Sequence, residues 1–222
     1  MISKKIYYVW LGGKEMPLEQ KECMKSWSKF CPDYQIIRLD ENTYNLDECP
    51  MARYFYDKGI YAFAASAIRF DVLSKNSGFY LDTDIELVKS LDCLLDMPSF
   101  VCKQDETYIP NEISSKGRFL LNNAFLGSNE DDKSIFNMCL SALEIAKDKK
   151  IAPAQAMNIP LLAKNPSTKN VNETEVFKDC AYMTQDTIIL PDMLMTNATI
   201  GIHYANLSWK KQWEASLKDK RD

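Results

Sequence analysis

The chain has 222 residues, of which 46% are hydrophobic and 26% are charged, which is the composition of a folded globular protein rather than a disordered one. This length suits one domain with a substantial core. The formal net charge is -4 and there is no long basic run, which argues against nucleic acid as a partner.

The N-terminal part of the chain predicts a strand, a helix and a second strand. Residues 6–11 form a continuous apolar run that ends at two glycines, which is typical of a buried parallel strand followed by a tight turn. Apolar residues at helical spacing follow Pro17, and Pro32 ends that helix. Residues 34–39 predict a second strand, so this part indicates a βαβ unit with a right-handed crossover.

The rest of the chain continues this alternation. We expect helices at 50–58, 62–75, 130–150, 153–163 and 209–220. We expect strands at 79–81, 85–88, 99–102, 124–126, 187–190 and 200–204, and a polar loop over 164–174. The pattern predicts a single α/β domain over residues 1–222, with a mostly parallel central sheet and flanking helices. In such sheets ligands bind at the carboxyl ends of the strands.

Asp82 and Asp84 follow the short apolar strand at 79–81. Side chains alternate along an extended chain, so we expect both carboxylates to point the same way. They repel each other unless a cation lies beside them, and hard divalent ions such as Mg²⁺ and Mn²⁺ prefer oxygen ligands. The hypothesis is a divalent metal that holds a nucleotide diphosphate. The alternative, which the tripeptide alone favours, is an acidic turn on the surface.

Several motifs, in order along residues 4 to about 210, resemble the glycosyltransferases whose sugar-binding region contains an Asp-x-Asp motif. That family includes bacterial capsular and lipopolysaccharide sugar transferases and fungal initiating α-1,6-mannosyltransferases, and more distantly the glucosylating domains of large clostridial toxins. The motifs are the opening Lys5–Gly13, the helical segment Ile68–Leu73, the metal motif Gly78–Asp84 and the C-terminal element His203–Trp209.

The resemblance implies a GT-A type, Rossmann-like fold and a retaining sugar transfer. The donor would be a nucleotide sugar, a UDP-sugar in the first place and GDP-mannose next. The acceptor would be a glycan or a lipid-linked saccharide, as in polysaccharide, capsule or lipopolysaccharide biosynthesis. The cofactor would be Mn²⁺ or Mg²⁺.

The resemblance also implies roles for individual residues. Asp82, Asp84 and Arg69 would be catalytic, and Asp82, Asp84 and His203 would be the metal ligands. The residues that would bind the nucleotide sugar are Val9, Trp10, Leu11, Ser66, Arg69, Tyr80, Leu81, Asp82, Thr83, Asn122, Asn123, Ser208 and Trp209.

Three of these residues have plainer alternatives. Trp10 would lie against the nucleotide base, since a large aromatic at a strand end suits stacking, but it could be a core tryptophan. Arg69 offers a planar fork of donors for the sugar or its phosphate, and its alternative is a surface ion pair with Asp71 or Glu86. His203 is the single histidine of the chain, and a lone histidine is commonly structural.

One position departs from the family pattern Ser-Asp-x-x-Arg, because Ser66 stands where a carboxylate is usual. In the resembling enzymes that carboxylate accepts hydrogen bonds from the donor sugar. Serine is shorter and uncharged, so its contact would be weaker. On helix 62–75 we expect Ala62, Ser66 and Arg69 to share one face and the apolar stripe Phe63, Ala67, Phe70 and Leu73 to form another.

Two competing functions stay open at this point. Phosphatases of the haloacid dehalogenase type also place Asp-x-Asp after an apolar strand, but they need a later acidic pair at a strand end. The one candidate pair, Asp131-Asp132, is typical of a helix start. The other alternative is a nucleotide-sugar-binding pseudoenzyme, which the serine at position 66 motivates.

The seven cysteines are odd in number and include no Cys-x-x-Cys pair, which argues against a disulfide framework or a zinc site and fits a reducing compartment. With no signal-peptide run and no apolar stretch of roughly 20 residues, we expect a cytoplasmic protein.

Trp209, Trp213 and Leu217 share one face of the predicted C-terminal helix. That face packs on the domain or, as an alternative, contacts an anionic membrane surface at the cytoplasmic side. The oligomeric state is not predicted.

Overall fold

The computed structural model describes residues 1–104, 120–149, 173–176 and 180–204. The helix expected at 153–163, most of the loop expected at 164–174, and the C-terminal helix lie outside these residues. Ser208, Trp209 and the proposed membrane face belong to that part of the chain.

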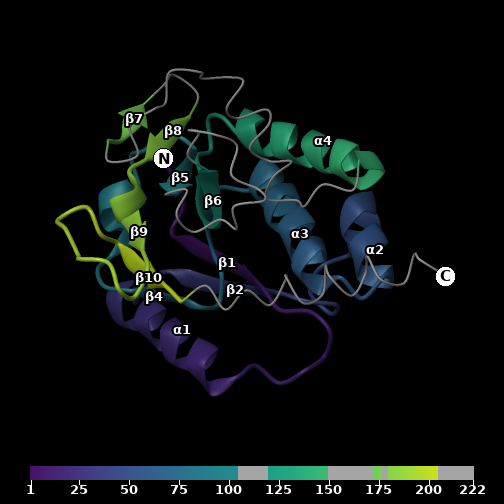
Figure 1. Ribbon diagram of the computed structural model, residues 1–222, viewed down its shortest axis with the longest axis horizontal. Helices are drawn as coiled ribbons and strands as arrows, with labels where there is room; N and C mark the ends of the chain where they lie inside the picture. The colour runs from purple at the N-terminus through teal and green to yellow at the C-terminus, as the bar shows by residue number, and fades with distance from the viewer. Residues whose placement is uncertain (105–119, 150–172, 177–179, 205–222) are drawn as a thin grey trace.

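A seven-stranded mixed sheet forms the centre of the molecule, in the order β2-β1-β3-β6-β5-β8-β7 (Figure 1). All strands except β6 and β7 run in the same direction, so the expected α/β sheet is confirmed. Its strands are β1 Lys5–Val9, β2 Gln35–Leu39, β3 Gly78–Leu81, β5 Phe100–Gln104, β6 Leu120–Ser128, β7 Glu175–Val176 and β8 Ala181–Met183.

A second, smaller sheet has the order β4-β10-β9. Its strands are β4 Ile85–Leu87, β9 Ile188–Ile189 and β10 Gly201–His203. The antiparallel β4–β10 pair and the parallel β10–β9 pair bring the late part of the chain back beside residue 85. This sheet carries part of the site described below.

The four described α-helices match the predicted ones within a few residues. They are α1 Leu18–Phe30, α2 Pro50–Asp57, α3 Tyr61–Lys75 and α4 Ser134–Lys149. Helix α4 begins later than expected because the Asp132 carboxylate accepts the Ser134 N–H at 2.8 Å ahead of the first turn. The sequence analysis did not predict strands β7 and β8 or the short 3₁₀ turns at Leu46–Glu48, Leu91–Leu94 and Gln185–Thr187. Each of these is too short to show a periodic pattern of apolar residues.

The central strands β1, β3, β5 and β8 are buried on both faces, so the chain builds two cores. Along β1 the side chains of Ile6 and Tyr8 pack on one side, and those of Tyr7 and Val9 pack on the other. Helices α2, α3 and α4 cover the second side, while α1 and the small sheet cover the first (Figure 1). This double burial explains why the strands read as continuous apolar runs.

Helix α3 is buried almost all round, so the predicted apolar stripe and the face that carries Ser66 and Arg69 both lie in the interior. Every residue from 63 to 73 except Ala65 is buried. The helix packs among α2, α4 and the sheet, so its polar side chains must find partners inside the protein. Arg69 and Asp71 are therefore buried polar groups with specific partners rather than surface charges.

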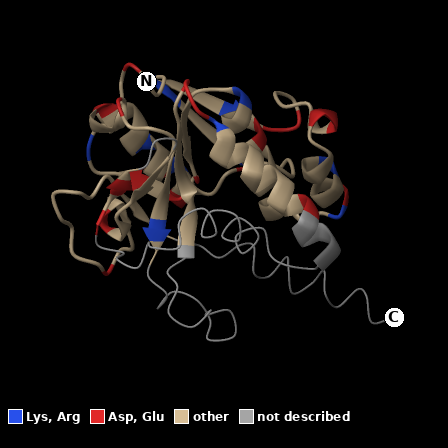
Figure 2. Cartoon of the chain, turned by 90° about the horizontal axis from the view of Figure 1, so that it is seen from above, with Lys and Arg blue, Asp and Glu red and all other residues tan. Residues whose placement is uncertain are grey.

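Acidic and basic segments are interspersed over the described ribbon (Figure 2). All seven cysteines are free, and six of them are buried. Among the described helices, none combines the length and the apolar character needed to cross a membrane.

Gly127 allows an aromatic cluster to form at the β5–β6 contact. A Cβ atom at this position would lie 2.1 Å from Cε1 of Phe100, which also contacts the rings of Phe79 and Phe125. We therefore expect Gly127→Ala to lower the free energy of unfolding by about 1–3 kcal/mol through overpacking, measured by urea denaturation. Adding Phe100→Leu should relieve the clash, so strictly additive effects in the double variant would contradict this explanation.

Candidate metal and donor site

A tight turn, rather than an extended strand, brings Asp82 and Asp84 together. Strand β3 ends at Leu81, and the N–H of Ile85 donates to the carbonyl of Asp82 at 3.1 Å. We expected the two carboxylates to point the same way because side chains alternate along an extended strand, and that reason is wrong. The carboxylates nevertheless lie close together, as predicted.

Backbone hydrogen bonds from both sheets hold this turn in place. The N–H of Asp82 donates to the Ala124 carbonyl of β6 at 2.8 Å, and the Asp84 carbonyl accepts from the N–H of Tyr204 at 3.0 Å. In the β4–β10 ladder, His203 is the partner of Ile85. Asp82 is thus anchored to the central sheet, whereas Asp84 and His203 are anchored to the small one.

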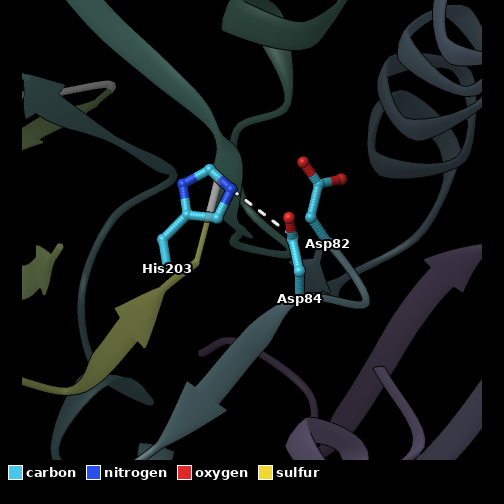
Figure 3. Close-up of side chains that lie close together, drawn as sticks. All are labelled: Asp82, Asp84 and His203. Atoms are coloured by element: carbon cyan, nitrogen blue, oxygen red, sulfur yellow. Dashed lines mark ion pairs between the residues drawn. The ribbon is translucent and has the colours of Figure 1, made fainter. Parts of the chain in front are cut away.

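Asp82, Asp84 and His203 form a cluster that fits a divalent cation. Each offers one ligand atom, and these atoms lie within 4.8 Å of one another. Figure 3 shows the His203 ring pointing at Asp84, with Nε2 at 3.4 Å from Oδ1. The three side chains are 16–28% exposed, so they are partly sheltered and still reachable. Two carboxylates and an imidazole suit Mn²⁺, and Mg²⁺ accepts the carboxylates.

Neighbouring charges and burial shift the protonation of the cluster when no cation is bound. Burial raises the pKa of Asp82 and the charge of Asp84 adds to this, while Arg69 opposes it. Burial lowers the pKa of His203, but the hydrogen bond and negative charge of Asp84 outweigh it and the net shift is upward. In both groups the site takes up protons more readily than usual, which is how crowded carboxylates are neutralised when no metal is bound.

Arg69 joins the metal motif from helix α3. Its Nη2 lies 2.9 Å from Asp82 Oδ1, its Nη1 donates to the Asn123 carbonyl, and its Cζ lies 4.4 Å from the centre of the Tyr80 ring. The Tyr80 hydroxyl donates to the same Asp82 oxygen at 2.8 Å. Arg69 and Tyr80 together fix the orientation of the first carboxylate.

The alternative of a surface ion pair for Arg69 is wrong, because the guanidinium is buried. Asp71 instead pairs with Lys75 and accepts from the Tyr44 hydroxyl. Glu86 accepts from the Tyr204 hydroxyl. One donor of the fork, the Nε–H of Arg69, is buried without a hydrogen-bond partner among the residues that the structure describes. Buried donors of this kind are rare, so this one calls for an acceptor.

The loop after β1 carries Trp10 in a defined orientation. Its indole N–H donates to the Lys14 carbonyl at 2.7 Å, and its side chain is only partly buried, so Trp10 is not a plain core tryptophan. Gly12 has a φ of +90° and a Cβ there would lie 2.7 Å from the Tyr61 ring. The loop therefore needs glycine at this point. Val9 is buried and Leu11 half-buried on either side of Trp10.

The remaining predicted donor contacts have varied environments. Ser66 is buried and its hydroxyl donates to the Ala62 carbonyl at 3.2 Å. Asn122 uses its side-chain oxygen to accept the Ala124 N–H at 2.6 Å. Thr83 is half-buried in the turn, whereas the Leu81 side chain is fully buried in the core. Which of these residues touch a donor stays a prediction.

A shallow hollow beside His203 contains residues that the sequence analysis missed. Its lining is Lys103, Gln104, Asn122, Gln185, Ile188, Leu190, Met193 and His203. Lys103 is buried there, and its Nζ donates to the Glu173 carbonyl at 2.6 Å and pairs with Glu175 at 3.2 Å. A lysine next to the end of an apolar strand was the one available signal, because the other lining residues come from short strands and turns.

Comparison with known proteins agrees with this geometry. Residues 17–101 match the family described as "Glycosyltransferase sugar-binding region containing DXD motif". This stretch includes Ser66, Arg69, Asp82 and Asp84. Over this stretch the chain is similar to the sugar-binding region of the DXD-containing glycosyltransferases. No curated protein sequence matches it.

Solved structures of glycosyltransferases resemble the fold of this chain. The PaToxG glycosyltransferase is 18% identical with a TM-score of 0.55, covering 74% of this chain and 70% of its own. An active-site mutant of LgtC is 14% identical with a TM-score of 0.51, covering 96% and 95%. LgtC described with donor and acceptor sugar analogs is also 14% identical, with a TM-score of 0.51 and 95% coverage of both chains.

These similarities identify the fold as GT-A, as expected from the sequence. They set aside the haloacid-dehalogenase alternative, whose acidic pair is also explained otherwise: Asp132 accepts the first N–H of α4. The chain thus has its two aspartates at the carboxyl end of β3 and its histidine beside them.

The single histidine allows a direct test of the cluster. In metal-free protein we expect the pKa of His203 to lie above 6.5, and to fall in Asp84→Asn, measured by NMR titration of the one set of imidazole signals. Because the folded-state pKa is raised, the stabilisation from this pair is complete below about pH 6.5 and is lost as the pH rises through the folded-state value. Asp96→Asn, at an exposed site, is the control, and an unchanged pKa in Asp84→Asn would contradict the pairing.

Proposed function

We propose that this protein transfers a sugar from a nucleotide-sugar donor to a glycan or lipid-linked acceptor, with retention of anomeric configuration and with Mn²⁺ or Mg²⁺ as cofactor. The observation that carries the proposal is the convergence of Asp82, Asp84 and His203 beside Arg69, inside and next to the matched sugar-binding region. A UDP-sugar is the first choice of donor and GDP-mannose the second. The resemblance to the family supplies the retaining outcome.

Asp82, Asp84 and His203 would hold the metal. A divalent cation bound there supplies Lewis-acid stabilisation of the charge that builds up on the leaving diphosphate. Arg69 contributes a permanent positive charge and planar donors next to the same position. Tyr80 and Arg69 keep Asp82 in one orientation, and Trp10 offers a partly exposed ring for stacking on the base.

Other parts of the proposal have separate support. LgtC is named as a galactosyltransferase in complex with donor and acceptor sugar analogs, and the shared GT-A fold supports a sugar donor and a sugar acceptor here. The hollow at His203 lies where an acceptor could approach the metal. Seven free thiols support a reducing, cytoplasmic compartment. Contact of the C-terminal segment with the membrane stays a prediction.

The first test is release of nucleoside diphosphate from a panel of nucleotide sugars. With Mn²⁺ we expect turnover of one donor, and a loss of at least about a hundredfold after chelation, because the metal contributes several kcal/mol to the transition state. Asp84→Asn should lose activity to a similar extent. Asp96→Asn, an exposed aspartate away from the cluster, should retain it. Equal release in the presence of chelator would exclude a catalytic metal.

Ser66 allows a second test, which also separates an active enzyme from a pseudoenzyme. Position 66 lies about one helical turn before Arg69, whose Nε–H lacks a partner in the described structure. A carboxylate here could accept from that N–H and from the donor sugar, and such charged hydrogen bonds are stronger than neutral ones. We expect Ser66→Asp to raise donor turnover on the order of tenfold, which corresponds to about 1.4 kcal/mol.

Ser66→Asn is the matched control, because asparagine has nearly the same size as aspartate but carries no charge. A gain restricted to Ser66→Asp would support a site weakened by the natural serine. A loss in Ser66→Asp would indicate that serine suits a different sugar and that the new charge is uncompensated. Equal kinetics in all three proteins would show that position 66 does not face the donor.

A further inference from the structure

The outer edge of strand β4 has no neighbouring strand among the described residues. Side chains of helix α1 form hydrogen bonds with the backbone of that edge instead. On its inner edge, Asp84 and Val88 bond to the chain of β10. Backbone groups alternate in direction along a strand, so those of Ile85 and Leu87 face the other way. There the Ile85 carbonyl accepts the indole N–H of Trp27 at 2.7 Å. The Leu87 N–H donates to the hydroxyl of Ser26 at 2.7 Å.

These two hydrogen bonds lie in the interior. Trp27, Ile85 and Leu87 are fully buried and Ser26 is 8% exposed. Ser26 is fixed further because its hydroxyl donates to the Cys23 carbonyl one turn back. Trp27 is fixed by an edge-to-face contact with Tyr8 of β1. Buried backbone groups without partners are costly, so α1 and β4 are tied in one register.

This register bears directly on the cluster. Asp84 immediately precedes Ile85, and His203 is the ladder partner of Ile85. Asp82 is held separately, by the Ala124 carbonyl of β6 and by Arg69. The distance between Asp82 and the Asp84–His203 pair therefore depends on where β4 lies relative to the central sheet, and helix α1 sets that position.

We propose that Ser26 and Trp27 are positioning residues for the metal site, acting through the backbone of β4. Neither is one of the three metal ligands. The inference rests on the proposed function, because it assumes that the cluster binds a divalent cation. A site binds its metal less tightly when the groups that orient the ligands are removed, and the loss of affinity is commonly tenfold or more.

The test compares two buried serines that make the same kind of hydrogen bonds. Ser99 accepts the N–H of Asn129 at 2.8 Å and donates to the Asp132 carbonyl, outside the β4 contact. Ser26→Ala and Ser99→Ala each leave a buried backbone N–H without its acceptor, so they should lower the free energy of unfolding by similar amounts. We expect Ser26→Ala alone to weaken Mn²⁺ binding, by roughly tenfold, measured by electron paramagnetic resonance of free Mn²⁺ during titration.

Two further variants make the result specific. Ser26→Thr keeps a hydroxyl and should retain Mn²⁺ affinity near that of the parent, and Trp27→Phe keeps an aromatic ring while losing the N–H and should weaken binding. If the parent binds Mn²⁺ and Ser26→Ala binds it as tightly as Ser99→Ala does, the positioning role is wrong and the proposed function stands. If the parent binds no Mn²⁺, the metal site itself is wrong and this inference fails with it.

Discussion

Two carboxylates held close together in a partly sheltered turn are the constraint on which the rest of the site depends. The turn that begins at Asp82 is closed by a backbone hydrogen bond and anchored to a strand on each side, so the backbone holds the two aspartates near each other. Their repulsion must be offset where they are. Arg69 and the Tyr80 hydroxyl serve Asp82, and His203 serves Asp84.

The two aspartates belong to different supporting structures although they are two residues apart. Asp82 is held by the central sheet and helix α3, and Asp84 is held by the small sheet, which helix α1 bonds at Ile85 and Leu87. In a site built across such a boundary, the distances between the ligands depend on how one support lies relative to the other. The late strand β10 is needed for the cluster because His203 lies on it and pairs with Ile85 of β4.

The sequence predicted most of the elements and the identity of the cluster, for reasons that can be traced to particular residues. Apolar runs such as Ile6–Leu11 indicate strands, and the two glycines at Gly12-Gly13 indicate a turn; both signals are local. What failed depends on tertiary contacts. The surface ion pair offered as an alternative for Arg69 fails because α3 is buried among its neighbours, and the pairing of Arg69 with Asp82 cannot be seen from spacing alone. The hollow lined by Lys103 and Gln185 joins elements too distant in the chain for any local pattern.

The charge balance of the cluster connects the fold to the proposed chemistry. Without a cation, Asp82 and Asp84 face the charge of Arg69 and, at a pH below the raised pKa of His203, that of a protonated ring, so the site is then close to neutral and has little attraction for a diphosphate. A bound divalent cation requires unprotonated His203, and it adds more positive charge than that proton supplied. Together with Arg69, the loaded site then carries a small excess of positive charge beside the cluster. Under the proposed function, the same residues that neutralise the empty turn would make affinity for an anionic donor conditional on the metal.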